Sequence, residues 1–196
     1  MAHLKKSTHL KKSYASRKSN RAPDSTLIAL EQYLPYLINR VGNTLVQLFS
    51  RDLAPFDLSV SMWRVIAVLG ELGSLRLIDL SGMTSIDAST LSRLIETMQR
   101  RRLVQRSCSA RNKREIVIAI TAKSEELLRV LAPIAVAYER EMTAGLSAAD
   151  LATTRETLSH MFARLADLKK SATQEMGRSR RQMPVLAKHV VMSNSK

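Results

Sequence analysis

The segment from Asp87 to Arg100, DASTLSRLIETMQR, decides the fold of this 196-residue chain. Its apolar residues recur at helical spacing along one side, whereas hydroxyl and arginine side chains occupy the other side. The apolar set is Leu91, Leu94, Ile95 and Met98. We expect a helix over residues 88–101 with Asp87 as its N-cap. This helix would bury one face and leave a polar, basic face free.

The sequence before this helix predicts two more. Ser59 is suited to cap a helix over residues 60–72, which Gly73 would end. A short helix over 77–83 follows, and a three-residue turn separates it from the helix at 88. Two helices joined by such a turn, the second beginning with small polar side chains, are typical of a helix-turn-helix, whose second helix enters the major groove of DNA.

The sequence after it predicts a β-hairpin. Residues 103–107 are consistent with a strand, and residues 114–120 are a β-branched, bounded segment. A polar turn separates the two. A hairpin directly after the recognition helix is the wing of a winged helix-turn-helix. The predicted fold class is therefore mainly α with a small β-hairpin wing.

Helices are expected on both sides of this unit. One begins near residue 27, is interrupted at Pro35 and ends near residue 53. After the wing, a long helix capped by Thr121 and kinked at Pro133 runs to about residue 143, and a last helix ends near residue 168. Its leucines are spaced by seven residues, at Leu151, Leu158 and Leu165. Such a seam needs a partner helix, and we favour one from a second chain over one from the same chain.

This organisation divides the chain into five parts. They are a disordered basic tail (1–24), an N-terminal dimerisation helix (25–57), a winged helix-turn-helix (58–120), C-terminal dimerisation helices (121–168) and a disordered basic tail (169–196).

The net charge of +14 is unevenly distributed along the chain. Residues 1–22 carry +7 and residues 169–196 carry +6, so the part between them is nearly neutral. Within that part, residues 93–114 hold eight bases and one acid, Glu96. A concentrated basic surface on a nearly neutral core favours a polyanionic partner, and duplex DNA fits better than a membrane surface.

Composition argues against several other classes. No segment is long and apolar enough to span a membrane, and no apolar stretch follows the basic N-terminus as in a secretory signal, so we expect a cytoplasmic protein. The four histidines and the single cysteine lack metal-ligand spacing, and no catalytic constellation or cofactor motif is recognisable. Cys108 stays open between a redox-sensitive thiol and an incidental residue of the wing.

From about residue 33 to residue 168, the sequence resembles the multiple-antibiotic-resistance regulator (MarR) family of bacterial winged-helix transcription factors. The segments that carry the resemblance are LSVSMWRVI (58–66), DLS (79–81), STLSRL (89–94), LVQR (103–106), NKR (112–114) and ITAK (120–123). Three positions depart from the family pattern. Asn112 replaces the acid of the wing, Arg102 replaces the glycine before the first strand, and Ser124 replaces a glycine early in the long helix, a change expected to matter little.

The resemblance implies a homodimer, built from the first and last helices, that binds a pseudo-palindromic duplex site. The residues expected to contact DNA are Ser89, Thr90, Ser92, Arg93, Thr97, Arg100, Arg111, Lys113 and Arg114. Arg93 could read guanine or contact a phosphate, and Arg106 could instead form a structural ion pair.

The family also implies a small aromatic or phenolic anion as effector. The candidate pocket residues are Tyr36, Arg40, Trp63 and Arg64, although Trp63 could simply belong to the core and either arginine to an ion pair. No cofactor is expected. Repression is the usual outcome in the family; activation, or a different role as a membrane-surface protein that uses the basic tails, are the alternatives.

Overall fold

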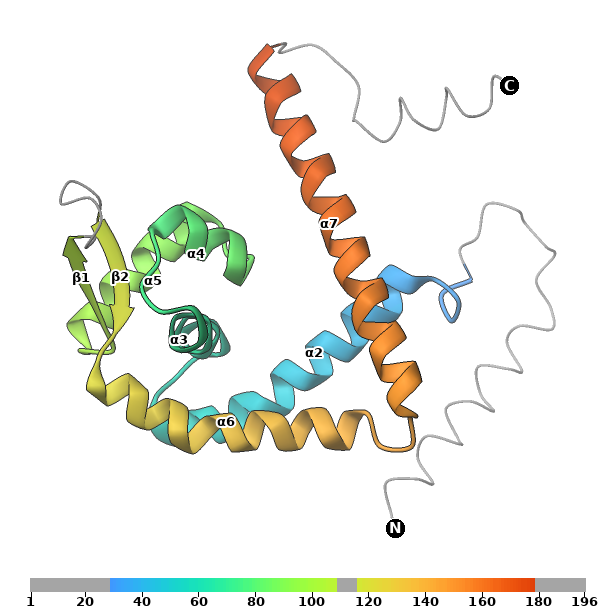
Figure 1. Cartoon of the computed structure of the whole chain (residues 1–196), viewed down its shortest axis with the longest axis horizontal. Coiled ribbons are helices and arrows are strands. Elements are labelled where there is room, and N and C mark those ends of the chain that lie inside the picture. Colours follow the sequence, from blue (N-terminus) through green and yellow to red (C-terminus); the bar gives the residue numbers. More distant parts are fainter. Residues whose placement is uncertain (1–28, 109–115, 179–196) are drawn as a thin grey trace. The chain divides into compact units, whose positions relative to one another are not determined.

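The computed structural model describes residues 29–108 and 116–178. The chain divides into two compact units, residues 1–135 and 136–196, which are described separately. The first unit contains α2 (Leu34–Leu53), α3 (Val60–Leu72), α4 (Leu77–Thr84), α5 (Ala88–Arg100), β1 (Val104–Cys108), β2 (Ile116–Ile120) and the first part of α6 (Ala122–Met142). The second unit contains the end of α6 and the helix α7 (Ala148–Arg178) (Figure 1).

Helix α2 begins at Leu34, so that Pro35 lies in its first turn. Proline is tolerated there because the N–H groups of a first turn have no partner within the helix. The expected helical segment before Pro35 is therefore wrong over residues 29–33, where a turn precedes α2, whereas the expected end of the helix near residue 53 is confirmed. Residues before 29 lie outside the described part of the chain.

Helices α3, α4 and α5 form the expected helix-turn-helix. Ser59 caps α3, since its Oγ accepts a hydrogen bond of 3.2 Å from the backbone N–H of Met62. Asp87 occupies the N-cap position of α5, but its side chain makes no capping hydrogen bond. The turn before it contains Ser85 with φ of 55°, a left-handed conformation that reverses the chain direction after α4.

The hairpin β1–β2 is antiparallel, with Val104 opposite Ile120 and Cys108 opposite Ile116. A third segment joins it, because Leu75 and Ile118 exchange two backbone hydrogen bonds of 3.0 and 2.8 Å. The sequence analysis did not predict this pairing, which fastens the connection between α3 and α4 to β2 and leaves that strand between two partners.

The core of the first unit is aliphatic and draws on nearly every element. Its buried apolar residues are Phe49, Leu53, Leu58, Met62, Val65, Ile66, Leu69, Leu80, Leu91, Ile95, Met98, Leu103, Val104, Val117, Ile118 and Leu131. Gly70 lets α3 and α6 approach closely, since a Cβ at this position would lie 2.4 Å from a methyl group of Leu128. Burial of these side chains supplies the main stabilisation of the unit.

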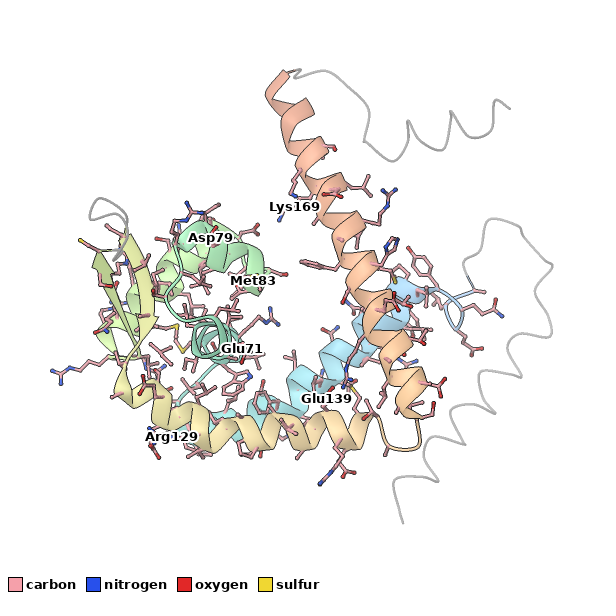
Figure 2. All side chains as sticks on the ribbon, viewed as in Figure 1. Glu71, Asp79, Met83, Arg129, Glu139 and Lys169 are labelled. Carbon is pink, nitrogen blue, oxygen red and sulfur yellow. The ribbon has the colours of Figure 1, made fainter. Side chains whose placement is uncertain are left out.

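In the second unit, a tight connection joins α6 to α7. Gly145 has φ of 88°, and Ser147 Oγ accepts a 3.1 Å hydrogen bond from the backbone N–H of Asp150, the arrangement of a capping box. Arg155 of α7 also pairs with Glu139 of α6 at 2.8 Å. Helix α7 continues to Arg178, so the prediction of an unstructured tail from residue 169 is wrong over residues 169–178. Lys169, labelled in Figure 2, lies in this helical part.

No single helix in the described ranges is long and apolar enough to cross a membrane. A short 3-10 helix, η1 (Ala54–Phe56), follows α2. Together, α2 with η1 and α3 pass the same test of length and composition, with a bend of 83° between the two halves.

Candidate nucleic-acid interface

Helix α5 separates its two faces as the sequence predicts. Leu91, Ile95 and Met98 are fully buried against the rest of the first unit. Of the candidate DNA contacts on this helix, Ser89, Thr90, Arg93 and Arg100 are exposed, and Ser92 and Thr97 are half-buried. The structure therefore brings six of the nine predicted contact residues together on one helix.

Three of these residues are already joined by hydrogen bonds. Thr97 Oγ1 donates to the carbonyl oxygen of Arg93 at 3.1 Å, and the guanidinium of Arg100 donates to Thr97 Oγ1 at 3.3 Å. The contact holds the Arg100 side chain along the helix surface. Arg93 is exposed and makes no side-chain hydrogen bond or ion pair with the described residues. Its guanidinium is therefore available for an acceptor outside the protein.

The carbonyl oxygens after α5 are tied to the start of α6. Thr121 Oγ1 donates to the carbonyl oxygen of Arg102 at 2.7 Å, and Ser124 Oγ donates to that of Leu103 at 2.6 Å. Lys123 Nζ reaches the carbonyl oxygen of Arg101 at 3.4 Å. Thr121 stands directly before α6 as expected, and its carbonyl oxygen accepts hydrogen bonds from the backbone N–H groups of Ser124 and Glu125. Its hydroxyl, however, donates to the turn after the recognition helix. Ser124, expected to matter little, is completely buried.

Arg102 adopts φ of 57°, in the left-handed region. The family pattern has a glycine here, and the arginine keeps the conformation that glycine would allow at a lower energetic cost. The turn that ends the recognition helix is thus retained despite the substitution, and the carbonyl group of Arg102 points toward Thr121.

Arg101 links the same turn to the corner between α2 and α3. Its guanidinium forms an ion pair of 2.9 Å with Asp57 and donates to the sulfur of Met62 at 3.1 Å. Asp57 itself has φ of 55°. One of the eight bases counted in the basic segment therefore serves a structural contact.

The turn of the helix-turn-helix is fixed by side chains that bond to backbone groups. Arg64 donates to the carbonyl oxygen of Thr84 at 3.2 Å, and Ser81 Oγ donates to that of Ile86 at 2.6 Å. Thr84 is buried, and its hydroxyl bonds back to Leu80 at 2.7 Å. The orientation of α5 relative to α4 is therefore held on both sides of the turn.

At the start of α4, Arg76 binds Asp79 through two hydrogen bonds of 2.5 and 3.0 Å. Figure 2 labels Asp79 on this helix. The hydrogen bonds from Arg76 lower the pKa of the Asp79 carboxyl below its ordinary value. The pair keeps a negative charge in the first turn of α4, where the helix dipole favours it.

The predicted wing contacts Arg111, Lys113 and Arg114 lie outside the described residues, as does Asn112. At the base of the wing, Arg106 is exposed on β1 opposite Ile118. Within the described ranges it forms no ion pair. Cys108 is also exposed, at the end of β1.

The four candidate effector-binding residues take part in three separate contacts. The Arg40 guanidinium lies 5.5 Å from the centre of the Tyr36 ring on α2, a cation–π arrangement. Trp63 packs edge-on against Phe49 with ring centres 5.5 Å apart, and Arg64 bonds to Thr84 as described. The structure thus places Tyr36 beside Arg40 and gives Trp63 and Arg64 partners within the fold.

The arrangement of α3, α4, α5 and the paired strands defines a winged helix-turn-helix protein. The model of the MarR family matches residues 58–116, from just before the start of α3 to the first residue of β2. The winged helix-turn-helix of this chain is therefore of the MarR type, the type to which the regulators that it resembles belong.

Similar proteins agree with this assignment. The chain is 24% identical over 133 residues to YwoH of Bacillus subtilis, described as an uncharacterized HTH-type transcriptional regulator, covering 68% of this chain and 93% of YwoH. A MarR family regulator from Silicibacter pomeroyi is 26% identical with a TM-score of 0.63, covering 70% of this chain and 92% of that one. Staphylococcus aureus MepR, solved with DNA, shares the fold at 20% identity with a TM-score of 0.62, covering 69% and 98%.

Proposed function

We propose that this regulator binds a pseudo-palindromic DNA site as a homodimer, with α5 of each protomer in a major groove. The observation that carries the proposal is the division of α5 into a fully buried apolar side and an exposed side of hydroxyls and arginines. In a two-fold dimer, the two recognition helices would meet half-sites about 10 bp apart, centre to centre. MepR, solved as a DNA complex, has the same fold.

Exposed apolar side chains support the homodimer. On α2, Leu34, Ile38 and Val41 are 54%, 43% and 54% exposed. In the second unit no described side chain is buried, and the exposed apolar residues of α7 are Leu158, Phe162 and Leu165. Contiguous exposed apolar side chains on a helix are typical of a surface that packs against another protein chain. We assign residues 25–57 and 121–168 to dimerisation and 58–120 to DNA binding.

The proposal includes repression of transcription in the cytoplasm, without a catalytic reaction. Repression needs no catalytic step, because a regulator bound over a promoter excludes polymerase, and repression is the usual outcome in the family that the chain resembles. A regulated promoter fused to a reporter gene distinguishes repression from activation. Deletion of the regulator raises reporter expression if it is a repressor and lowers expression if it is an activator.

A salt titration tests the DNA-binding proposal. If a dimer neutralises about eight phosphates, the logarithm of its affinity falls against the logarithm of salt concentration with a slope near −7. The measurement uses fluorescence anisotropy with an isolated binding site and excess random duplex as competitor.

Arg93→Ala is expected to weaken binding. The matched control is Arg129→Ala, which removes an exposed arginine paired with Glu126 on α6. Sequence-independent binding alone, unchanged by Arg93→Ala, contradicts the proposal.

A small aromatic anion as effector is a second proposal, and it rests on the Tyr36–Arg40 pair. A ring beside a guanidinium offers one surface for stacking and one charge for a carboxylate or phenolate. Titration with salicylate as the probe should release the protein from its site. Tyr36→Ala should weaken this response while leaving DNA affinity without salicylate unchanged.

A further inference from the structure

The recognition helix carries one acidic residue, Glu96, and its position is central to the exposed face. Glu96 follows Ser89 by seven residues, which is nearly two helical turns, and it lies three residues after Arg93 and four before Arg100. These four side chains therefore share one face, opposite the buried Leu91, Ile95 and Met98. Glu96 is exposed like its basic neighbours. Any duplex that contacts Arg93 and Arg100 must also meet this carboxylate.

Glu96 has no structural partner within the described part of the chain. It forms no hydrogen bond or ion pair there, although the spacing to Arg93 and Arg100 would permit either pair. Arg100 donates to Thr97 instead. Glu96 also lies in the C-terminal half of α5, where the helix dipole disfavours a negative charge. Stabilisation of the helix therefore does not explain why an acidic residue occupies this position.

Electrostatics alone would disfavour the residue in a DNA-binding face. A carboxylate repels phosphates and is only an acceptor of hydrogen bonds. In the major groove, however, the cytosine N4 amino group is a donor, and glutamate or aspartate is its fitting partner. Arg93, one helical turn earlier, can donate hydrogen bonds to the O6 and N7 acceptors of guanine. An acid between two arginines thus provides a means of discriminating between bases that a uniformly basic helix lacks.

We propose that Glu96 is a specificity-determining residue that accepts a hydrogen bond from a cytosine amino group in each half-site. This inference rests on the proposed function, because it requires α5 to lie in the major groove. It assigns to Glu96 a direct contact with a base edge, and to the flanking arginines the attraction that offsets the repulsion between the carboxylate and the phosphates.

Selection from a pool of random duplexes tests the proposal. The full-length protein, Glu96→Gln and Glu71→Gln are each used to recover bound sequences. Glutamine keeps the length of the side chain but pairs best with adenine N6 and N7. We expect one position in each half-site to change from cytosine to adenine in Glu96→Gln, with a preference of roughly tenfold for the new base. The other positions should be unchanged.

Glu71→Gln is the matched control, since it removes the same charge from an exposed position at the end of α3 (Figure 2). It should recover the wild-type site. If Glu96→Gln keeps every base preference and only binds all duplexes more tightly, Glu96 merely adjusts the overall charge and the inference is wrong. If the wild-type protein recovers no preferred sequence, the proposed function itself fails. Circular dichroism of the variants shows that each remains folded.

Discussion

Ser124 Oγ donates a hydrogen bond of 2.6 Å to the carbonyl oxygen of Leu103, and both residues are buried. The bond joins α6 to the residue that starts the wing. Ser124→Ala is expected to lower the free energy of unfolding by about 1 kcal/mol, because the carbonyl loses its strongest partner but keeps the backbone N–H of Thr121 at 3.2 Å. Urea denaturation measures the change. Ser74→Ala, at an exposed site, should be nearly neutral; equal effects of both variants would contradict the assignment.

Arg102→Gly is expected to stabilise the protein. The left-handed backbone at this position costs an L-residue about 1 kcal/mol more than glycine, and part of that gain is offset by the greater freedom of glycine in the unfolded chain. A rise in the midpoint of urea denaturation is the expected result. Arg102→Ala has the same strain without the long side chain, so a similar rise in that variant would show that charge and not backbone conformation is responsible.

The ion pair between Asp57 and Arg101 is expected to contribute little to stability. Asp57 is 92% exposed and Arg101 is 25% exposed, so water and salt screen the attraction. A double-mutant cycle with Asp57→Ala and Arg101→Ala should give a coupling energy below about 1 kcal/mol. The coupling should shrink further at high salt. A larger coupling that resists salt would mean that the pair is effectively desolvated.

The Arg76–Asp79 pair should make stability depend on pH in the acidic range. Its hydrogen bonds lower the pKa of the Asp79 carboxyl in the folded protein. The contribution of the pair to the free energy of unfolding is therefore fully present above the pKa that the Asp79 carboxyl has in the unfolded chain. It is lost as the pH falls through the lower pKa of the folded protein. An NMR titration of the Asp79 carboxyl should show a depressed midpoint. Arg76→Ala should return it toward the ordinary value, and an unchanged midpoint in that variant would refute the stated cause.

Arg100 and Arg93 should affect DNA binding differently. Arg100 is held along the helix by Thr97, so we expect a phosphate contact. Arg100→Ala should weaken binding to all duplexes similarly and reduce the salt slope by about 2 for a dimer, since each protomer loses one contact. Arg93→Ala should relax the preference at one guanine if that residue reads a base. Anisotropy titrations on the preferred site and on variants of that guanine separate the two effects.

The helix-turn-helix could be predicted closely because its signals are local. Ser59 and Gly73 mark both ends of α3, and the structure places that helix at Val60–Leu72 as expected. The apolar spacing of α5 identified its buried face, although Leu94 is only half-buried. Periodicity and capping residues are sufficient where each helix has one side in the core.

Features that depend on distant residues could not be predicted. The pairing of Leu75 with Ile118 involves a single residue on one side, which leaves no alternating pattern in the sequence. The direction of the Thr121 hydroxyl depends on a carbonyl group 19 residues earlier. The extension of α7 lacks an apolar stripe, but residues such as Lys, Ala, Gln, Glu and Met in residues 169–178 favour a helix by propensity alone.

The candidate site was only partly accessible to the same reasoning. The six candidate contacts on α5 lie on that helix as the helical period predicts, although only four of them are exposed and Ser92 and Thr97 are half-buried. The roles of Arg64 and Arg101 were not evident, because a basic side chain gives no indication of whether its partner is a phosphate or a backbone carbonyl. The significance of Glu96 became visible only once the partners of its neighbours were known.

The hydrogen bonds from Thr121 and Ser124 close the hairpin at its base, between Leu103 and the start of α6. The two ends of residues 104–120 are therefore fastened to the same point of the fold. Because the anchor lies at Leu103 and the start of α6, we expect the segment between them to be replaceable as a unit while the recognition helix keeps its place. Replacing residues 104–120 with the hairpin of a relative should then alter contacts with the DNA that flanks each half-site, while α5 stays unchanged.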